Sequence, residues 1–330
     1  MPAEWERHDA TWLSWPKDPS TFPSGILPKV ESAYVAMVRV LAEDEEVRVM
    51  VNDQKAESKV SSMIGSSANV SIKILKTVDV WVRDYGPTYV RGRDVAAIKW
   101  TFNAWGNKYE DLLPDDEAGG RMVESSGLRA FRPGVVLEGG SIDVNGSGSL
   151  ITTKQCLLNS NRNPRLNQGS LEAVLKDNLG VSNVIWLGEG IEGDDTDGHV
   201  DDIARFIAPR KVVVAAEADL TDANHEPLEA DRRILENALD ESGRRSEIIP
   251  LPMPKRVYAQ DVRLPASHLN FYIGNGAVLV PTFGGSSDKW AVITLEEAFP
   301  HREVVGIDCR ALVYGLGTLH CVTQQVPSTL

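Results

Sequence analysis

The sequence of 330 residues has 47 acidic and 34 basic side chains, which gives a formal net charge of −13 at neutral pH. This charge argues against a general nucleic-acid-binding protein, because phosphate backbones are held by excess lysine and arginine, and it favours small cationic ligands. The composition also argues against a membrane-spanning chain and a disulfide framework, since no stretch approaches the roughly 18 apolar residues of a membrane span and only three cysteines are present.

Two further features predict the compartment. The N-terminal sequence MPAEWERHDATW lacks the basic and then apolar layout of a signal peptide. Cys156, Cys309 and Cys321 are odd in number, unlike a set of paired cysteines. We therefore expect a cytoplasmic protein whose thiols are reduced and available for chemistry.

Five helices are predicted from apolar residues that recur with helical spacing. The pattern is clearest over residues 28–44, where one face carries Val30, Tyr34, Met37, Val38 and Leu41. Pro28 opens that segment, as proline commonly does in the first turn of a helix. Similar patterns predict helices at about 54–64, 170–179, 228–242 and 288–299. The expected N-caps are Ser170 and Ser287, and the expected C-terminal stops are Gly180 and Gly243.

Strands are predicted where β-branched runs follow these helices and where further apolar runs lie between them. The runs that follow helices span 47–51, 70–75, 183–187, 247–251 and 302–307. The other runs span 80–86, 95–102, 148–153, 202–208, 211–216 and 276–281. The chain thus repeats strand, strand, helix, strand about five times at intervals of roughly 60 residues, which is typical of an α/β protein built from structural repeats. No Pro- or Ser-rich linker divides the chain, so we expect a single domain over residues 1–330.

The glycine-rich segment GEGIEG resembles a dinucleotide-binding loop in spacing only. Gly188, Gly190 and Gly193 match G-x-G-x-x-G, but the segment contains two glutamates and runs into DDTDGHVDD instead of a helix. A pyrophosphate there would meet carboxylates, so a nucleotide site is not expected. A calcium loop fails as well, because Ala204 stands where the bidentate glutamate belongs.

His199 and Asp201 form the most chemically suggestive pair. At a spacing of two they would share one face of an extended strand, just before the apolar run 202–208. One alternative is an acidic surface turn. Another is a non-haem iron site completed by His268 or His320, although neither histidine is followed by the arginine that usually holds an oxo-acid.

Two more carboxylates occur in apolar surroundings. Alternation in DVWVRDYG would place Asp84 on the side of two valines, which is costly unless the carboxylate is paired, for instance with a nearby arginine. Glu138 follows another apolar run and precedes Gly139 and Gly140, which suggest a close approach to the backbone or a bulge. Carboxylates that converge on one histidine and one cysteine suit a planar cation, since a guanidinium presents its N–H donors in a fork that carboxylates match.

Five segments, in this order over nearly the whole chain, resemble the agmatine deiminase branch of the peptidylarginine deiminase family, within the guanidino-group-modifying (pentein) superfamily. They are WVRDYGPTYV, LEGGSIDV, DTDGHVDD, LPASHLNFYIGNGAVLVP and GTLHCVTQQ. The resemblance implies a five-bladed α/β propeller of pseudo-fivefold ββαβ units around a central site. It also implies that no metal or organic cofactor is needed.

The resemblance also implies roles for individual residues. Cys321 would be the nucleophile and His199 the general acid and base, with Glu138 beside it. Asp84 and Asp201 would grip the guanidinium. The substrate channel would be lined by Trp81, and the far amino end of agmatine recognised by Asp195. The chain departs from the family pattern GGGNIHC at Leu316 and Thr318, and it has His268 where tyrosine is more usual.

The chemistry follows from the nucleophile. A guanidinium carbon is a poor electrophile, so a thiolate must be held over it, and a nearby cation can lower the pKa of a free cysteine from about 8.5. Attack by Cys321 and loss of ammonia, protonated by His199, would leave a covalent thiouronium intermediate that water hydrolyses. The expected reaction converts agmatine to N-carbamoylputrescine and ammonia, a step toward putrescine.

Several alternatives remain open at this stage. One is a deiminase of free or peptidyl arginine, in which Arg83 or Arg162 would hold an α-carboxylate, and another is an amidinotransferase on the same scaffold. A binding protein without activity would not need Cys321. The oligomeric state, including a homo-oligomer, is left open, and His320 is expected to point away from its neighbour and to play a structural role.

Overall fold

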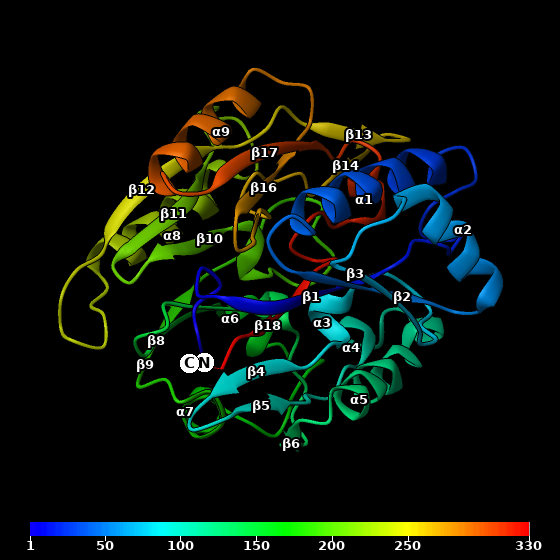
Figure 1. The fold of residues 1–330 in the computed structure, drawn as a ribbon. Coiled ribbons are helices and arrows are strands. Elements are labelled where there is room, and N and C mark those ends of the chain that lie inside the picture. The colour runs from blue at the N-terminus through cyan, green and yellow to red at the C-terminus, as the bar shows by residue number, and fades with distance from the viewer. Residues whose placement is uncertain (330) are drawn as a thin grey trace.

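The computed structural model describes residues 1–329, and these form a mixed α/β fold (Figure 1). The α-helices are α1 (Leu27–Leu41), α2 (Gln54–Ile64), α3 (Val82–Tyr85), α4 (Ala104–Asn107), α5 (Asp115–Ser126), α6 (Lys154–Leu157), α7 (Gln168–Leu179), α8 (His225–Asn237) and α9 (Ser287–Ala298). The short 3-10 helices are η1 (Glu110–Leu112), η2 (Gly139–Ser141), η3 (Val200–Asp202) and η4 (Leu312–Gly315). The strands are β1 (His8–Ser14), β2 (Glu46–Val51), β3 (Val70–Ile74), β4 (Thr88–Arg91), β5 (Val95–Ile98), β6 (Arg129–Phe131), β7 (Ile142–Val144), β8 (Ser149–Thr153), β9 (Asn183–Leu187), β10 (Ala204–Ala208), β11 (Lys211–Ala216), β12 (Glu247–Pro252), β13 (Val257–Ala259), β14 (Val262–Leu264), β15 (Tyr272–Ile273), β16 (Ala277–Thr282), β17 (Glu303–Asp308) and β18 (Gln324–Pro327).

Five sheets share one pairing scheme. Their strand orders are β18-β1-β2-β3, β4-β5-β6, β7-β8-β9, β10-β11-β12 and β15-β16-β17. In each sheet the first pair is antiparallel and the second is parallel. A parallel pair needs a crossover, and each crossover contains one longer helix, in chain order α1, α5, α7, α8 and α9. The repeated strand, strand, helix, strand order therefore has a structural counterpart, with β13–β14 as an additional hairpin.

The two ends of the described chain meet in one sheet. Strand β18 pairs with β1 in antiparallel register, with Thr11 opposite Gln325 and Trp12 opposite Gln324. Figure 1 shows the two ends side by side, with the last strand between β1 and β4. Because β18 follows Cys321 directly, this pairing fixes where that residue lies.

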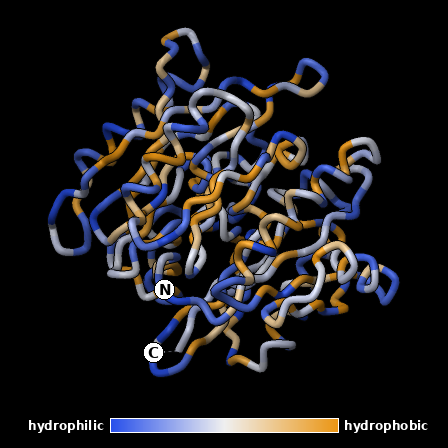
Figure 2. Tube along the Cα trace, turned by 45° about the horizontal axis from the view of Figure 1, so that its top comes forward, coloured by the Kyte–Doolittle hydropathy of each residue, from blue (hydrophilic) through white to orange (hydrophobic). Residues whose placement is uncertain are grey.

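The core is formed by apolar side chains from all five sheets and the inner faces of the helices. Helix α1 buries the stripe that its sequence predicts, including Tyr34, Met37 and Leu41. Figure 2 shows hydrophobic segments gathered toward the middle and hydrophilic segments in the outer loops. Among residues 1–329 no helix is both long and apolar enough to span a bilayer.

The predicted helices exist, but their ends differ from the predictions. The side chain of Asn167, and not that of Ser170, caps α7 by accepting a hydrogen bond from the Ser170 amide. Helix α9 begins at Ser287, so this residue is inside the helix. Gly180 ends α7 in the left-handed conformation as predicted. Helix α8 ends at Asn237, well before Gly243, and helix α5 was not predicted.

The prediction of a strand over residues 80–86 is wrong. Residues 82–85 form the short helix α3, so the alternation that placed Asp84 beside two valines does not apply. Tertiary contacts hold this turn, since the Arg83 amide donates to the carbonyl of Cys321 and Asp84 bonds to two other segments. A local β-propensity is readily overridden by such contacts.

Candidate active site

A pocket of about 180 Å³ leads to the buried thiol of Cys321. Its lining combines acidic and apolar side chains and consists of Asp18, Ser20, Thr21, Asp79, Trp81, Asp84, Trp105, Tyr109, Asp111, Leu112, Asp195, Thr196, Tyr314, Gly315, Leu316, Gly317 and Cys321. Five of these residues are aspartates, and neither lysine nor arginine is among them. The pocket therefore suits a narrow cationic ligand with an apolar middle.

Cys321 lies in a turn just before β18. Its thiol is 3.1 Å from the side-chain amide nitrogen of Asn270 and 3.7 Å from Oδ2 of Asp201. The Asn270 side-chain carbonyl in turn accepts hydrogen bonds from Thr318 and from the backbone amides of His320 and Cys321. Asn270 thus fixes the turn that carries the thiol. Thr318, one of the departures from the family pattern, contributes to that turn.

Asp84 projects from α3 and accepts two hydrogen bonds. The amide of Gly140 donates to Oδ1 and Nε1 of Trp105 donates to Oδ2, each at 3.0 Å. Trp105 belongs to α4, where residues 104–107 all have positive φ angles, from 50° to 87°. Such a run is strained for residues other than glycine and places the indole against the carboxylate. The predicted pairing of Asp84 with an arginine is wrong.

His199 immediately precedes η3, and Asp201 lies within η3. The prediction that the two residues share one face of an extended strand is therefore wrong. Its Nδ1 lies 3.7 Å from Oδ1 of Asp84, and neither ring nitrogen has a hydrogen-bond partner among the described residues. Burial lowers the pKa of His199, but the nearby charges of Asp84 and Asp201 outweigh burial and hold this pKa well above its usual range. A buried protonated imidazole with unused donors is suited to proton transfer.

Glu138 lies at the start of η2, fully buried. Its Oε1 accepts from Nε of Arg162 at 2.6 Å, while Oε2 has no partner within residues 1–329. The following glycines allow close packing, because a Cβ at Gly140 would lie 2.6 Å from Nδ1 of His199. This agrees with the close backbone approach predicted for the GG pair.

One group of side chains has the composition of a metal site. Ligand atoms of Glu138, Cys156 and His199 lie within 4.8 Å of one another. The guanidinium of Arg162 already supplies positive charge at Glu138, and this opposes a cation there. The alternative iron site of His199 and Asp201 is not among such groups in the described chain. His268 contacts Pro281 and Ser287, and His320 contacts Asp201 with one ring nitrogen and Glu4 with the other.

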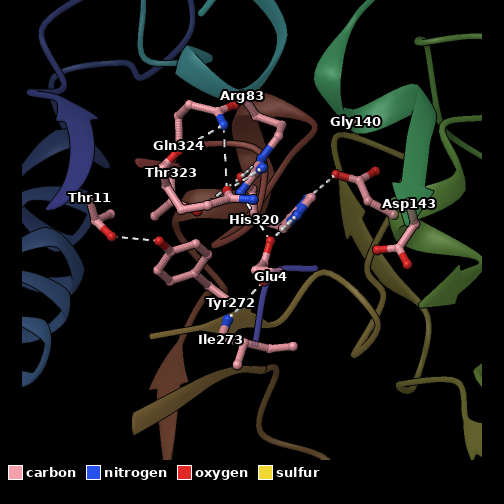
Figure 3. A network of polar contacts seen from close by, with 12 residues as sticks. Glu4, Thr11, Arg83, Gly140, Asp143, Tyr272, Ile273, His320, Thr323 and Gln324 are labelled. Carbon is pink, nitrogen blue, oxygen red and sulfur yellow. Dashed lines mark hydrogen bonds and ion pairs between the residues drawn. The ribbon is translucent and has the colours of Figure 1, made fainter. Parts of the chain in front are cut away.

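Asp201 is held on one side only. Its Oδ2 is 2.7 Å from Nδ1 of His320, and its buried Oδ1 has no protein partner in the described chain. Residues 319–322 form a turn, not an extended segment, so the expectation that the His320 side chain points away from that of Cys321 is wrong: both contact Oδ2 of Asp201. The other ring nitrogen of His320 contacts Glu4 (Figure 3).

The pocket lining also includes Trp81 and Asp195, the residues that the resemblance assigns to the substrate channel. Trp81 donates from Nε1 to Asp79 at 2.9 Å, and Asp195 accepts from the hydroxyl of Tyr109. Burial raises the pKa of both aspartates above the usual range. A bound ammonium group would relieve that desolvation cost.

The electrostatics of the empty site disfavour negative charge on the sulfur. Burial, followed by the charges of Asp201, Asp202 and Asp84, holds the pKa of Cys321 well above its ordinary value. Burial likewise raises the pKa of Asp84 to about 6, against the opposing charge of His199. A planar cation placed among these groups would lower both pKa values.

Arg83 and Arg162, the two candidates for holding an α-carboxylate, are both engaged elsewhere. Arg83 donates to Glu4 and Gln325, and Arg162 bonds to Glu138 and Asp197. Neither arginine lines the pocket.

The structure therefore gathers Cys321, His199, Glu138, Asp84 and Asp201, with Trp81 and Asp195 in the lining of the same pocket. Sequence reasoning missed Glu4, Trp105 and Asn270. Asn270 lies in LPASHLNFYIGNGAVLVP, one of the segments that carried the resemblance, whereas no pattern indicated Glu4 or Trp105.

Comparison with known proteins decides the family. The family model described as Porphyromonas-type peptidyl-arginine deiminase matches residues 1–327. The chain belongs to this family. Agmatine deiminase from Ectopseudomonas mendocina (strain ymp) is 37% identical over 353 residues, covering 99% of this chain and 95% of the relative.

Solved structures of family members have the same fold. Agmatine deiminase of Enterococcus faecalis is 31% identical, with a TM-score of 0.93, and the match covers 100% of this chain and 96% of that one. A cysteine-to-serine variant of agmatine deiminase from C. jejuni with substrate bound is 31% identical, with a TM-score of 0.89 and coverage of 99% and 96%.

Proposed function

We propose that this protein is an agmatine deiminase, a hydrolase acting on C–N bonds of linear amidines, which converts agmatine and water to N-carbamoylputrescine and ammonia. The full-length similarity to agmatine deiminases supports this function. The observation that carries the choice of substrate is the pocket itself, which has five aspartates and no cationic side chain. Agmatine is cationic at both ends, so no part of it requires an arginine or lysine.

In this proposal Cys321 is the nucleophile, and Asp84 and Asp201 hold the guanidinium over it. The aromatic ring of Trp81 flanks the four-carbon chain, and Asp195 binds the distant ammonium. These roles are supported by the pocket lining, which includes Cys321, Asp84, Trp81 and Asp195, and by Oδ2 of Asp201, which lies 3.7 Å from the Cys321 thiol.

The bound cation prepares the thiol for attack. Its charge offsets the aspartates that raise the pKa of Cys321, so the thiol releases its proton to solvent and the thiolate forms where the guanidinium carbon lies. The sulfur adds to that carbon, and the protonated His199 gives its proton to the departing nitrogen, which leaves as ammonia.

Hydrolysis completes the cycle. His199, now neutral, accepts a proton from water, and the oxygen adds to the carbon of the thiouronium intermediate. The C–S bond breaks, the ureido product leaves and the thiol is restored. Glu138 has a free, buried oxygen near His199 and is positioned to stabilise its protonated form.

Free arginine is the main competing substrate. Its α-carboxylate would lie in the acidic outer part of the pocket, where Arg83 and Arg162 cannot reach it because both are engaged in buried ion pairs. An amidinotransferase would use the same first step and an amine in place of water, and no observation favours it.

The architecture and surroundings are part of the proposal. We infer that the five similar sheets are blades of one α/β propeller and that residues 1–330 form one domain, supported by the shared pairing scheme and by the β1–β18 pair. Three unpaired buried cysteines support a cytoplasmic location. Several points stay predictions: a role in putrescine formation, the absence of a cofactor and of nucleic-acid partners, and a homo-oligomeric state.

One experiment tests the function. Purified protein is incubated with agmatine, free arginine and a peptide ending in arginine, and ammonia and ureido product are measured. We expect turnover of agmatine, and loss of activity on the order of 1,000-fold or more in Cys321→Ala. Cys309→Ala, which removes another buried thiol away from the pocket, is the matched control and should keep its activity. Turnover of arginine but not agmatine would refute the substrate.

A further inference from the structure

A buried network of charged side chains lies behind the proposed active site (Figure 3). At its centre is His320, whose Nδ1 is 2.7 Å from Oδ2 of Asp201 and whose Nε2 is 2.8 Å from Oε2 of Glu4. Glu4 lies in the N-terminal segment, 316 residues away in sequence. All three side chains are buried.

Glu4 is ionised in this network. Its two oxygens accept four hydrogen bonds, from His320, Arg83, Arg205 and the amide of Ile273. Burial alone would raise the pKa of Glu4, but the charges of Arg205 and His320 hold it well below its usual range. A carboxylate in this state has no proton to donate, so Nε2 of His320 must carry the hydrogen.

The other ring nitrogen of His320 faces Asp201, with Nδ1 2.7 Å from Oδ2. The pKa of Asp201 is lowered, because its contacts with His320 outweigh the effect of burial. The ring is therefore clamped between two carboxylates, with one ring nitrogen on each.

Two arginines face the carboxylates of the network: Arg83 pairs with Glu4, and Arg205 pairs with Glu4 and Asp143. The ring of His320 occupies Oδ2 of Asp201, so Oδ1 is the oxygen without a partner in the described part of the chain. His320 also touches the site through its backbone, since its amide bonds to Asn270 beside the thiol.

We propose that Glu4 and His320 are positioning residues for the deimination reaction, in which Glu4 holds the ring of His320 and His320 orients Asp201 so that its Oδ1 faces the substrate guanidinium. The inference rests on the proposed function. A histidine with only a structural role would not need to bond to a carboxylate that lies 3.7 Å from the thiol.

Alkylation of Cys321 provides a test that does not require agmatine turnover. The rate with 2-chloroacetamidine, a planar cation, is divided by the rate with 2-chloroacetamide, its neutral counterpart, and modification is located by mass spectrometry. We expect a high ratio in the wild type and a fall of about tenfold or more in His320→Asn, as expected for one misplaced charge-assisted hydrogen bond. Glu4→Gln, which keeps the shape but removes the charge, should lower the ratio in the same direction.

The matched control is His268→Asn, because His268 is equally buried but lies away from Asp201, with polar contacts to Pro281, Ser287 and Asp288 and the ring of Phe283 beside it. It should destabilise the protein without changing the ratio. Thermal melts show whether each variant is folded. If His320→Asn does not fold, the alkylation ratio of Glu4→Gln is the test. A ratio within twofold of the wild type in folded Glu4→Gln and His320→Asn overturns the inference. If agmatine is not turned over but the ratio still falls, the proposed substrate is lost and the inference stands.

Discussion

Cys321 lies among aspartates that oppose ionisation of its thiol. This differs from the sequence-based expectation that a neighbouring cation would lower the thiol pKa, because in the unliganded site the negative charges of Asp201, Asp202 and Asp84 and the effect of burial dominate. The cation needed for activation is the substrate. In a site of this kind the nucleophile stays a protonated thiol until a guanidinium binds.

The rate at which iodoacetamide alkylates Cys321 in the free protein should rise with pH through a midpoint above the value of about 8.5 for an ordinary thiol. In Asp84→Asn the midpoint should move downward, because one negative neighbour is removed. The measurement is the pH dependence of the rate at this cysteine. A wild-type midpoint at or below that of free cysteine would contradict the electrostatic account.

The dependence of kcat/KM on pH should show an acid limb set by Asp84. Its pKa is raised to about 6, and only the ionised carboxylate attracts the guanidinium, so activity should increase as pH rises through about 6. The Nε1–H of Trp105 stabilises the ionised form, so Trp105→Phe should move this limb to higher pH. A limb near the ordinary aspartate pKa of about 4 in the wild type would show that Asp84 does not control it.

At the scale of the elements, short helices and turns carry the site, and the longer helices and strands support them. Asp84 is on the four-residue α3, and Glu138 directly precedes η2. His199 directly precedes η3, and Asp201 lies within η3. Periodicity does not specify such turns, so two of these segments were assigned to strands. Most of the longer elements were predicted, because each buries one continuous apolar face. Helix α5, which contains the adjacent glycines Gly119 and Gly120, was missed.

The cap of α7 gives a direct test of an element boundary. Asn167→Ala should lower the free energy of unfolding by about 1 kcal/mol, because the Ser170 amide loses its hydrogen-bond acceptor. Ser170→Ala, at the cap predicted from sequence, should have a clearly smaller effect, since its hydroxyl bonds only to Asn167. Urea denaturation of both variants measures the difference. Equal losses would show that the cap is not where the structure places it.

At the scale of the whole molecule, the site joins segments that are far apart in the chain. Residues near positions 4, 84, 138, 199, 270 and 321 all contribute side chains or backbone groups to it. Oδ1 of Asp201 has no hydrogen-bond partner in the described chain, so a guanidinium bound there would stabilise the fold through these segments.

Cys321→Ser, which removes the nucleophile, should bind agmatine without consuming it. At agmatine concentrations about 100 times the Kd, the folded state should gain about 2.7 kcal/mol, seen as a rise in Tm. N-carbamoylputrescine carries the same amine but a neutral ureido group, so at equal concentration it should raise Tm less. An equal or larger shift with the ureido compound would contradict a site built for a guanidinium cation.

The sequence by itself determined the α/β class, most of the helices and strands, and the chemical character of the site. Apolar spacing reports burial of one face, and isolated carboxylates beside glycines report a site that must hold a cation. Only the tertiary structure decided that Arg83 and Arg162 are engaged outside the pocket, that Trp105 supports Asp84, and that His320 contacts Asp201 and Glu4. The reason is physical, because these contacts join residues on different sheets and loops, and their partners are chosen by distance and charge in the folded chain.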